Sequence, residues 1–212
     1  MQNHRSARLN NRGFTLAELL VGLFISGVVM TTILSAYYSQ KKSYAVQDQL
    51  AAMVQNLRAA MDSMAREIRI AGYDPKGLAN AGIVVADTTS ITVTEDLDGD
   101  GAIAGDESIT YALADSDGDG DTDLERNSNL IAENIDALNF IYLDTDGNQT
   151  AVPSKIRSVQ ITMVAKTARG DLGYVDKEEY RNQLDTPLLG PVNDSFRRRR
   201  LTAEVTCRNL GL

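Results

Sequence analysis

The feature that most constrains this chain is a predominantly apolar run over residues 14–36, in which Glu18 is the single charged residue. A run of about 23 residues forms about 35 Å of helix, which is enough to cross a bilayer with some tilt. Three arginines and no acid precede the run. Because positively charged flanks stay in the cytoplasm, we expect residues 14–36 to span the membrane, with the C-terminal bulk of the chain on the far side.

The position of Glu18 needs a physical reason, because a carboxylate inside a membrane costs about 2.5–3.5 kcal/mol on insertion scales. The small residue Gly13 lies before the apolar run, whereas no A-x-A-like cleavage site follows it. Cleavage after Gly13 would remove a leader of residues 1–13 and create an amino terminus at Phe14. This amine would lie one helical turn from Glu18 and could neutralise it, within one helix or between neighbours. The alternative is a plain signal anchor whose Glu18 reaches the lipid headgroups.

The segment Gly-Phe-Thr-Leu-Ala-Glu-Leu-Leu-Val, residues 13–21, resembles the type III signal of type IV pilins and type II secretion pseudopilins. The resemblance implies cleavage between Gly13 and Phe14 by a prepilin peptidase, N-methylation of Phe14, and Glu18 as the acid required for assembly. Ala17 stands where many members have a bulkier apolar residue. The resemblance also implies a single-pass protein of the inner membrane with a periplasmic C-terminal domain, which later joins a pilus fibre at the cell surface.

The helix is predicted to continue beyond the membrane as an amphipathic segment over residues 37–72. Residues 37–71 contain neither proline nor glycine, and apolar side chains recur at three- and four-residue spacing from Leu50 to Ile68. Gly72 and Pro75 then supply a stop signal. We expect the apolar stripe to pack against a globular domain, and the alternative is a coiled-coil partner.

Residues 73–212 are predicted to form a β-rich domain, because short apolar segments alternate there with Asp-Gly and Asn turns. The expected strands are residues 83–86, 90–94, 108–113, 130–133, 138–143, 155–166 and 201–208. Short connections favour an antiparallel sheet. A long helix on such a sheet resembles the α+β pilin fold. Polar residues 168–198 are expected to be a long loop, which in pilin-like proteins would be a variable surface that faces partners.

Acidic residues are concentrated in one part of the chain, since residues 95–146 hold sixteen acids and one base, Arg126. Residues 96–107 fit a calcium-binding loop with acids at positions 1, 3, 5 and 12 and glycine at position 6. The predicted Ca²⁺ ligands are Asp96, Asp98, Asp100, the carbonyl of Ala102 and a bidentate Glu107. Because the flanks are strand-like, the loop would lie within a sheet. The alternative is a solvated Asp/Gly hairpin.

A second acidic run follows and fits the same pattern less well. Its candidate ligands are Asp115, Asp117, Asp119 and Asp121. Gly120 occupies position 6, but position 12 is Arg126. We therefore expect an incomplete or shared site.

The histidine, cysteine and arginine residues of the chain argue against several common kinds of catalytic and binding site. The only histidine, His4, lies in the predicted leader, so the mature chain would have no Ser-His-Asp triad and no histidine-ligated zinc, and we expect no enzyme. The single cysteine, Cys207, is expected to be a buried thiol, with intermolecular pairing as the alternative. The tetrad Arg197–Arg200 lacks interleaved aromatic residues and is expected to be solvated or salt-bridged, with no nucleic-acid partner.

Within the pilin family, residues 131–140 and 208–210 resemble the PilW-like branch of minor pilins. This resemblance implies a minor pilin that primes pilus assembly at the tip and supports adhesion, twitching motility or DNA uptake. Its partners would be other major and minor pilins, the prepilin peptidase and the inner-membrane assembly machinery. Two alternatives remain at this point. One is the J-type pseudopilin of a type II secretion system, and the other is a membrane-anchored, calcium-dependent binding protein that never polymerises.

Overall fold

The computed structural model describes residues 13–115 and 117–211. The predicted leader, apart from Gly13, therefore lies outside the described residues. The chain divides into two compact units, residues 1–46 and residues 47–212, and we call the second the head unit. Within the first unit, the described residues form the N-terminal part of helix α1 (Leu16–Ile70).

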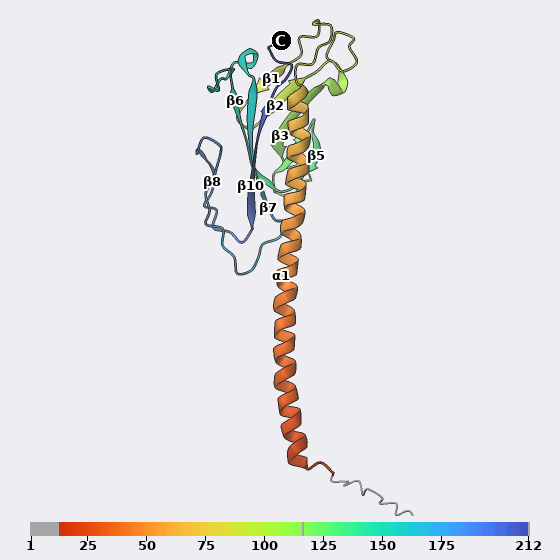
Figure 1. Cartoon of the computed structure of the whole chain (residues 1–212), viewed down its shortest axis with the longest axis vertical. Coiled ribbons are helices and arrows are strands. Elements are labelled where there is room, and N and C mark those ends of the chain that lie inside the picture. Colours follow the sequence, from red (N-terminus) through yellow and green to blue (C-terminus); the bar gives the residue numbers. More distant parts are fainter. Residues whose placement is uncertain (1–12, 116, 212) are drawn as a thin grey trace, which may run out of the picture. The chain divides into compact units, whose positions relative to one another are not determined.

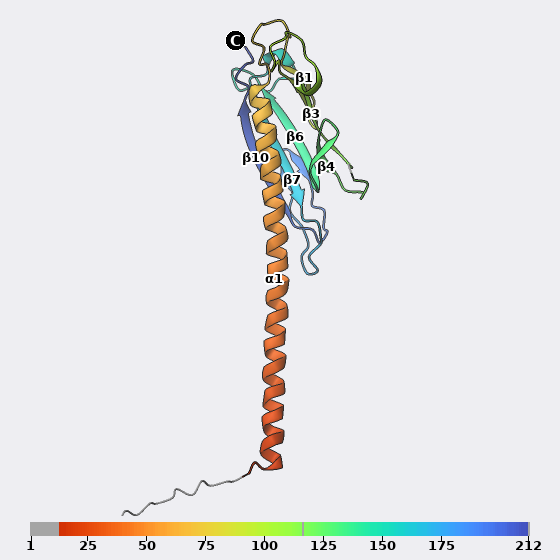
Figure 2. The ribbon, with the colours of Figure 1, turned by 90° about the vertical axis from the view of Figure 1, so that its right-hand side faces the viewer.

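The head unit contains two antiparallel sheets and a small hairpin (Figures 1 and 2). The first sheet has five strands in sequence order: β1 (Ile83–Ala86), β2 (Ile91–Thr94), β3 (Ser108–Ala114), β4 (Asp123–Arg126) and β5 (Asn129–Ala132). The second has the order β10-β7-β6, from β6 (Ile135–Leu143), β7 (Ser158–Lys166) and β10 (Arg198–Thr206). The hairpin pairs β8 (Tyr180–Arg181) with β9 (Pro187–Leu189), and two short 3₁₀ helices cover Gly105–Glu107 and Pro153–Lys155.

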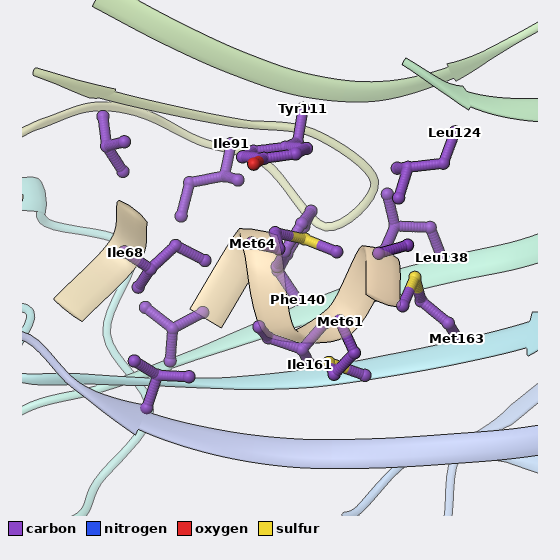
Figure 3. Close-up of a cluster of buried hydrophobic side chains, with 14 of the residues drawn as sticks. Met61, Met64, Ile68, Ile91, Tyr111, Leu124, Leu138, Phe140, Ile161 and Met163 are labelled. Atoms are coloured by element: carbon purple, nitrogen blue, oxygen red, sulfur yellow. The ribbon is translucent and has the colours of Figure 1, made fainter. Parts of the chain in front are cut away.

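The core of the head unit lies between the C-terminal part of α1 and side chains from both sheets (Figure 3). The helix contributes buried residues at the predicted spacing: Met53, Leu57, Ala60, Met61, Met64 and Ile68. Facing them are Ile91, Tyr111 and Leu124 from the first sheet and Phe140, Ile161 and Met163 from the second. This packing confirms that the apolar stripe covers the sheets of the same chain, because burial of this stripe is what stabilises an amphipathic helix.

The end of α1 is fixed by Gly72 and by the C-terminal residues of the chain. Gly72 has φ +83°, a left-handed conformation that favours glycine, and an added Cβ would collide with the side chain of Leu210. The last helical carbonyls are also satisfied from the C-terminus. The backbone N–H of Arg208 donates to the Arg69 carbonyl at 3.1 Å, and Asn209 Nδ2 donates to the Ile70 carbonyl at 2.9 Å. The predicted helix stop at Gly72 is thus confirmed.

Some of the expected strand boundaries were wrong. The segment 123–126 forms β4, although its Asp-Leu-Glu-Arg sequence has one apolar residue, because it pairs with β3 on one side and β5 on the other. Residues 168–198 are not structureless, since they contain the β8–β9 hairpin. Strand β10 begins at Arg198 rather than residue 201, and its ladder with β7 runs from Arg198 to Thr206.

Met64 tests the core directly, since its side chain has no exposed surface. We expect Met64→Ala to lower the free energy of unfolding of the head unit by about 2–5 kcal/mol, because the truncation leaves a cavity between the helix and both sheets. Urea denaturation of the detergent-solubilised chain measures the loss. Gln55→Ala, at an exposed position of the same helix, is the matched control and should change it by less than about 0.5 kcal/mol. Equal effects of the two substitutions would contradict this core.

Candidate functional sites

Glu18 lies in the first turn of α1, where Thr15 holds it in a capping box. The carboxylate oxygen Oε2 accepts hydrogen bonds from the Thr15 backbone N–H at 2.8 Å and from the Thr15 hydroxyl at 2.9 Å. In return, the Glu18 backbone N–H donates to Thr15 Oγ1 at 3.2 Å. The T-x-x-E spacing of Thr15 and Glu18 is a recognisable signature of a helix N-terminus. Within one chain, Glu18 is therefore satisfied by Thr15, and Gly13 and Phe14 lie just before the helix.

The N-terminal part of α1 is apolar and exposed on every face. Its large side chains are exposed, and those of Leu16, Phe24 and Ile33 are more than half exposed. The hydroxyl groups of Ser26, Thr31 and Thr32 donate to carbonyls of their own helix, that of Ser26 to the Gly22 carbonyl at 2.7 Å. Among the described residues, this is the one helix long and apolar enough to cross a membrane. A helix that satisfies its polar groups internally and exposes apolar side chains all round suits lipid or other apolar helices.

Tyrosines and lysines follow the apolar run. Tyr37, Tyr38 and Tyr44 are exposed, and Lys41 and Lys42 lie between them in the sequence. Aromatic rings with a polar tip are enriched at membrane–water interfaces, and lysine ammonium groups extend into the aqueous side. This composition is consistent with the expected end of the membrane segment near residue 37.

The loop of residues 96–107, which we call the first acidic loop, joins β2 to β3 and is folded by its own carboxylates. Asp98 Oδ1 accepts from the Asp100 N–H at 2.9 Å, and Asp100 Oδ1 accepts from the Ala102 N–H at 2.8 Å. Gly101 has φ +92°, as the sharp turn at position 6 requires. Its N–H donates to Asp96 Oδ2 at 3.1 Å.

Glu107 closes the first acidic loop from its far end. Its Oε1 accepts from the Leu97 N–H at 2.8 Å, and its Oε2 accepts from the Ala104 N–H at 3.0 Å. These backbone bonds, with that from Ala104 the largest influence, hold the pKa of Glu107 below its usual value. One oxygen each of Asp96, Asp98 and Glu107 lie within 4.8 Å of one another. The structure thus brings together three of the four predicted carboxylate ligands, and Asp100 is not in this group.

In the second acidic loop (residues 115–121), Asp117 Oδ1 accepts from the Asp119 N–H at 3.2 Å and Asp119 Oδ1 accepts from the Asp121 N–H at 2.9 Å. Carboxylate oxygens of Asp115, Asp117 and Asp119 lie within 4.8 Å of one another, and all three residues are exposed. Asp121 instead forms an ion pair with Lys166 at 2.5 Å. Position 12, Arg126, belongs to β4, and its Nε bonds both oxygens of Glu67 on α1 at 3.0 and 3.1 Å. Arg126 thus stands at the position from which Glu107 closes the first acidic loop.

Two members of the arginine tetrad, Arg197 and Arg198, are salt-bridged within the chain, whereas Arg199 and Arg200 are exposed. Arg198 is 3% exposed and contacts three carboxylates. Its Nε lies 2.6 Å from Asp136, its Nη1 lies 3.0 Å from Asp176, and its Nη2 lies 2.7 Å from Asp194. Asp176 and Asp194 belong to the segment 168–198. These bonds therefore fix that segment to the second sheet.

Replacement of Arg198 should be strongly destabilising, because it leaves buried carboxylates without their cation. We expect Arg198→Met to cost about 3–5 kcal/mol at neutral pH. Arg198 holds the pKa of Asp194 below its usual 3.8, so this carboxylate contributes stability that is lost as the pH falls through its lowered value. The difference between variant and parent, measured by urea denaturation, should therefore shrink below about pH 3.8. Arg200→Met, at an exposed position of the same strand, is the control, and an equal loss there would contradict the assignment.

Cys207 is buried, at 3% exposure, directly after β10. Burial raises the pKa of its thiol to about 11, which disfavours the reactive thiolate. The expectation of a buried thiol is thus confirmed.

We expect a thiol reagent such as iodoacetamide to label Cys207 only after the head unit is unfolded. In the native fold the sulfur of Cys207 is buried, and its raised pKa disfavours the thiolate. Mass spectrometry before and after denaturation measures the labelling. Rapid labelling of the native chain, or a disulfide-linked dimer on a non-reducing gel, would favour the intermolecular alternative.

Comparisons with known proteins agree with the N-terminal geometry and with the fold. Residues 8–34 match the prokaryotic N-terminal methylation motif. No curated protein matches the chain in sequence. In structure the chain is similar to a type IV-like pilin from Thermus thermophilus, with a TM-score of 0.50 and 15% identity, over 74% of this chain and 98% of that chain. The chain therefore combines the N-terminal methylation motif with a pilin-like α+β fold.

Proposed function

We propose that the protein is a PilW-like minor type IV pilin, which enters the pilus and helps to prime its assembly as part of a tip complex. The observation that carries this proposal is the start of α1. A capped acid, Glu18, lies one turn from the predicted cleavage point, at the beginning of a helix whose apolar side chains are exposed all round. The methylation motif over residues 8–34 supports processing by a prepilin peptidase and assembly with other pilins.

Glu18 would have two successive partners, first Thr15 and then an α-amino group. Before assembly, Thr15 satisfies the carboxylate within the same helix, which lowers the cost of an acid in the membrane. After cleavage, the new α-amino group at Phe14 supplies a positive charge. In a bundle of such helices, the amine of one subunit and Glu18 of the next neutralise each other, and the exposed apolar side chains exchange lipid for neighbouring helices.

The head unit would then be displayed on the fibre, where it supports adhesion, twitching motility or DNA uptake. The segment 168–198 is held on the second sheet by the Arg198 ion pairs and offers a defined surface to neighbouring pilins. A J-type pseudopilin would share the N-terminal segment and the fold, so the identity of the neighbouring genes separates the two systems. The non-polymerising, calcium-dependent anchor makes a different prediction, since it would never enter a fibre.

Substitution of Glu18 tests the proposal. We expect Glu18→Gln to remain in the inner membrane and to be cleaved, but to fall at least tenfold in the sheared fibre fraction, because the interchain pair with the Phe14 amine is lost. Quantitative immunoblots of membrane and fibre fractions measure the ratio. Asp48→Asn, an exposed acid later on the same helix, is the matched control and should behave as the parent. Glu18→Gln at the parent level in fibres, or a parent chain that never enters fibres, would contradict the proposal.

A further inference from the structure

We propose that the first acidic loop binds one Ca²⁺ ion per chain and that this ion fixes the segment that follows α1. The inference concerns the head unit and does not depend on polymerisation. Three oxygens, from Asp96, Asp98 and Glu107, already lie within 4.8 Å of one another. Ca²⁺ takes six to eight oxygen ligands at about 2.3–2.6 Å, so a small movement of these groups would bring them onto one ion.

The observation that points to a ligand is an unsatisfied oxygen of Asp96. This residue has no exposed surface. Its Oδ2 accepts the Gly101 N–H, whereas its Oδ1 is buried and has no hydrogen-bond partner. A buried carboxylate oxygen without a partner is costly, on the order of 1–3 kcal/mol or more. A cation at the centre of the loop would satisfy this oxygen together with those of Asp98 and Glu107.

The remaining ligands and the charge also favour Ca²⁺. Glu107 Oε1 accepts two backbone N–H groups and Oε2 accepts one, so Oε2 retains a lone pair for a cation. The carboxylate of Asp100 and the carbonyl of Ala102 lie at positions 5 and 7 of the loop and would complete the shell. A flexible all-oxygen shell suits Ca²⁺ better than Mg²⁺, which demands octahedral geometry and retains its waters.

The described residues of the second acidic loop do not offer an equivalent site. Its three clustered carboxylates are all exposed, Asp121 is bound to Lys166, and Arg126 stands in place of the closing acid. This difference between the two loops predicts one ion per chain rather than two.

The first acidic loop is joined to the chain that follows α1. The backbone N–H of Asp96 donates to the Tyr73 carbonyl at 2.7 Å, and the Gly72 N–H donates to the Thr94 carbonyl at 2.9 Å. Gly99 and Gly101 lie close to the side chains of Pro75 and Leu78. An ion held by Asp96 therefore also holds residues 72–78 in place, and Lys76 is an exposed trypsin site within this segment.

The test uses the full chain in mild detergent, stripped with EDTA and titrated with CaCl₂ by calorimetry. We expect one Ca²⁺ per chain, with a dissociation constant at or below about 1 mM and much weaker binding of MgCl₂. Saturating Ca²⁺ should raise the thermal midpoint by at least about 2 °C and slow tryptic cleavage at Lys76 at least fivefold.

Three variants assign the site. Asp98→Asn should weaken Ca²⁺ binding at least tenfold without unfolding the chain, since Asp98 is exposed. Asp106→Asn, an exposed acid of the same loop outside the cluster, and Asp119→Asn in the second acidic loop should leave binding unchanged. No binding up to 10 mM CaCl₂, an equal loss in Asp106→Asn, or a loss in Asp119→Asn alone would overturn the proposal.

Discussion

The structure depends on the single helix α1, whose N-terminal and C-terminal parts have different distributions of apolar side chains. In residues 16–46 the apolar side chains are exposed on all faces, so this part suits lipid or other helices. In residues 47–70 they are confined to a stripe that is buried by two sheets. One continuous α1 can serve both because a helix satisfies its backbone hydrogen bonds internally in either environment. The membrane segment and the core of the head unit are thus encoded by two patterns on the same element.

Charged groups in the described residues are mostly placed beside a partner. Thr15 holds Glu18, Arg126 pairs with Glu67, and Arg198 is surrounded by carboxylates. Each arrangement lowers the cost of removing a charge from water. The buried Oδ1 of Asp96 is an exception, and it lies in the loop whose sequence already fits a calcium site. A bound cation would give this buried oxygen a partner of opposite charge, as most other charged groups in the described residues have.

Local signals in the sequence predicted much of the fold. The spacing from Leu50 to Ile68 and the stop at Gly72 depend on neighbours along the chain, and both were confirmed. The strand expected over residues 155–166 is present as β7, which begins three residues later. Strand β4 was not predicted, because its sequence has no alternation of apolar and polar residues. It is stabilised by hydrogen-bonded pairing with β3 on one side and β5 on the other. The partners of Arg198 were equally hidden, since Asp136 lies 62 residues away in the sequence.

Some features of the candidate sites could be predicted from the sequence, and others could not. The spacing of acids predicted the first acidic loop, and the Thr15–Glu18 box could have been found from its T-x-x-E spacing. The burial of Asp96 could not be predicted from the sequence, because it depends on how the first acidic loop packs on the segment after α1. Likewise, the bond of Asp121 to Lys166 required the second sheet to lie beside the second acidic loop.

The central claim is that the mature protein begins with an amine at Phe14, one helical turn from Glu18. Intact-mass analysis of the chain extracted from membranes tests it most directly. The account predicts a mass that lacks residues 1–13 and carries one methyl group on the amino terminus of Phe14. A mass that retains residues 1–13, with Phe14 unmodified, would contradict it.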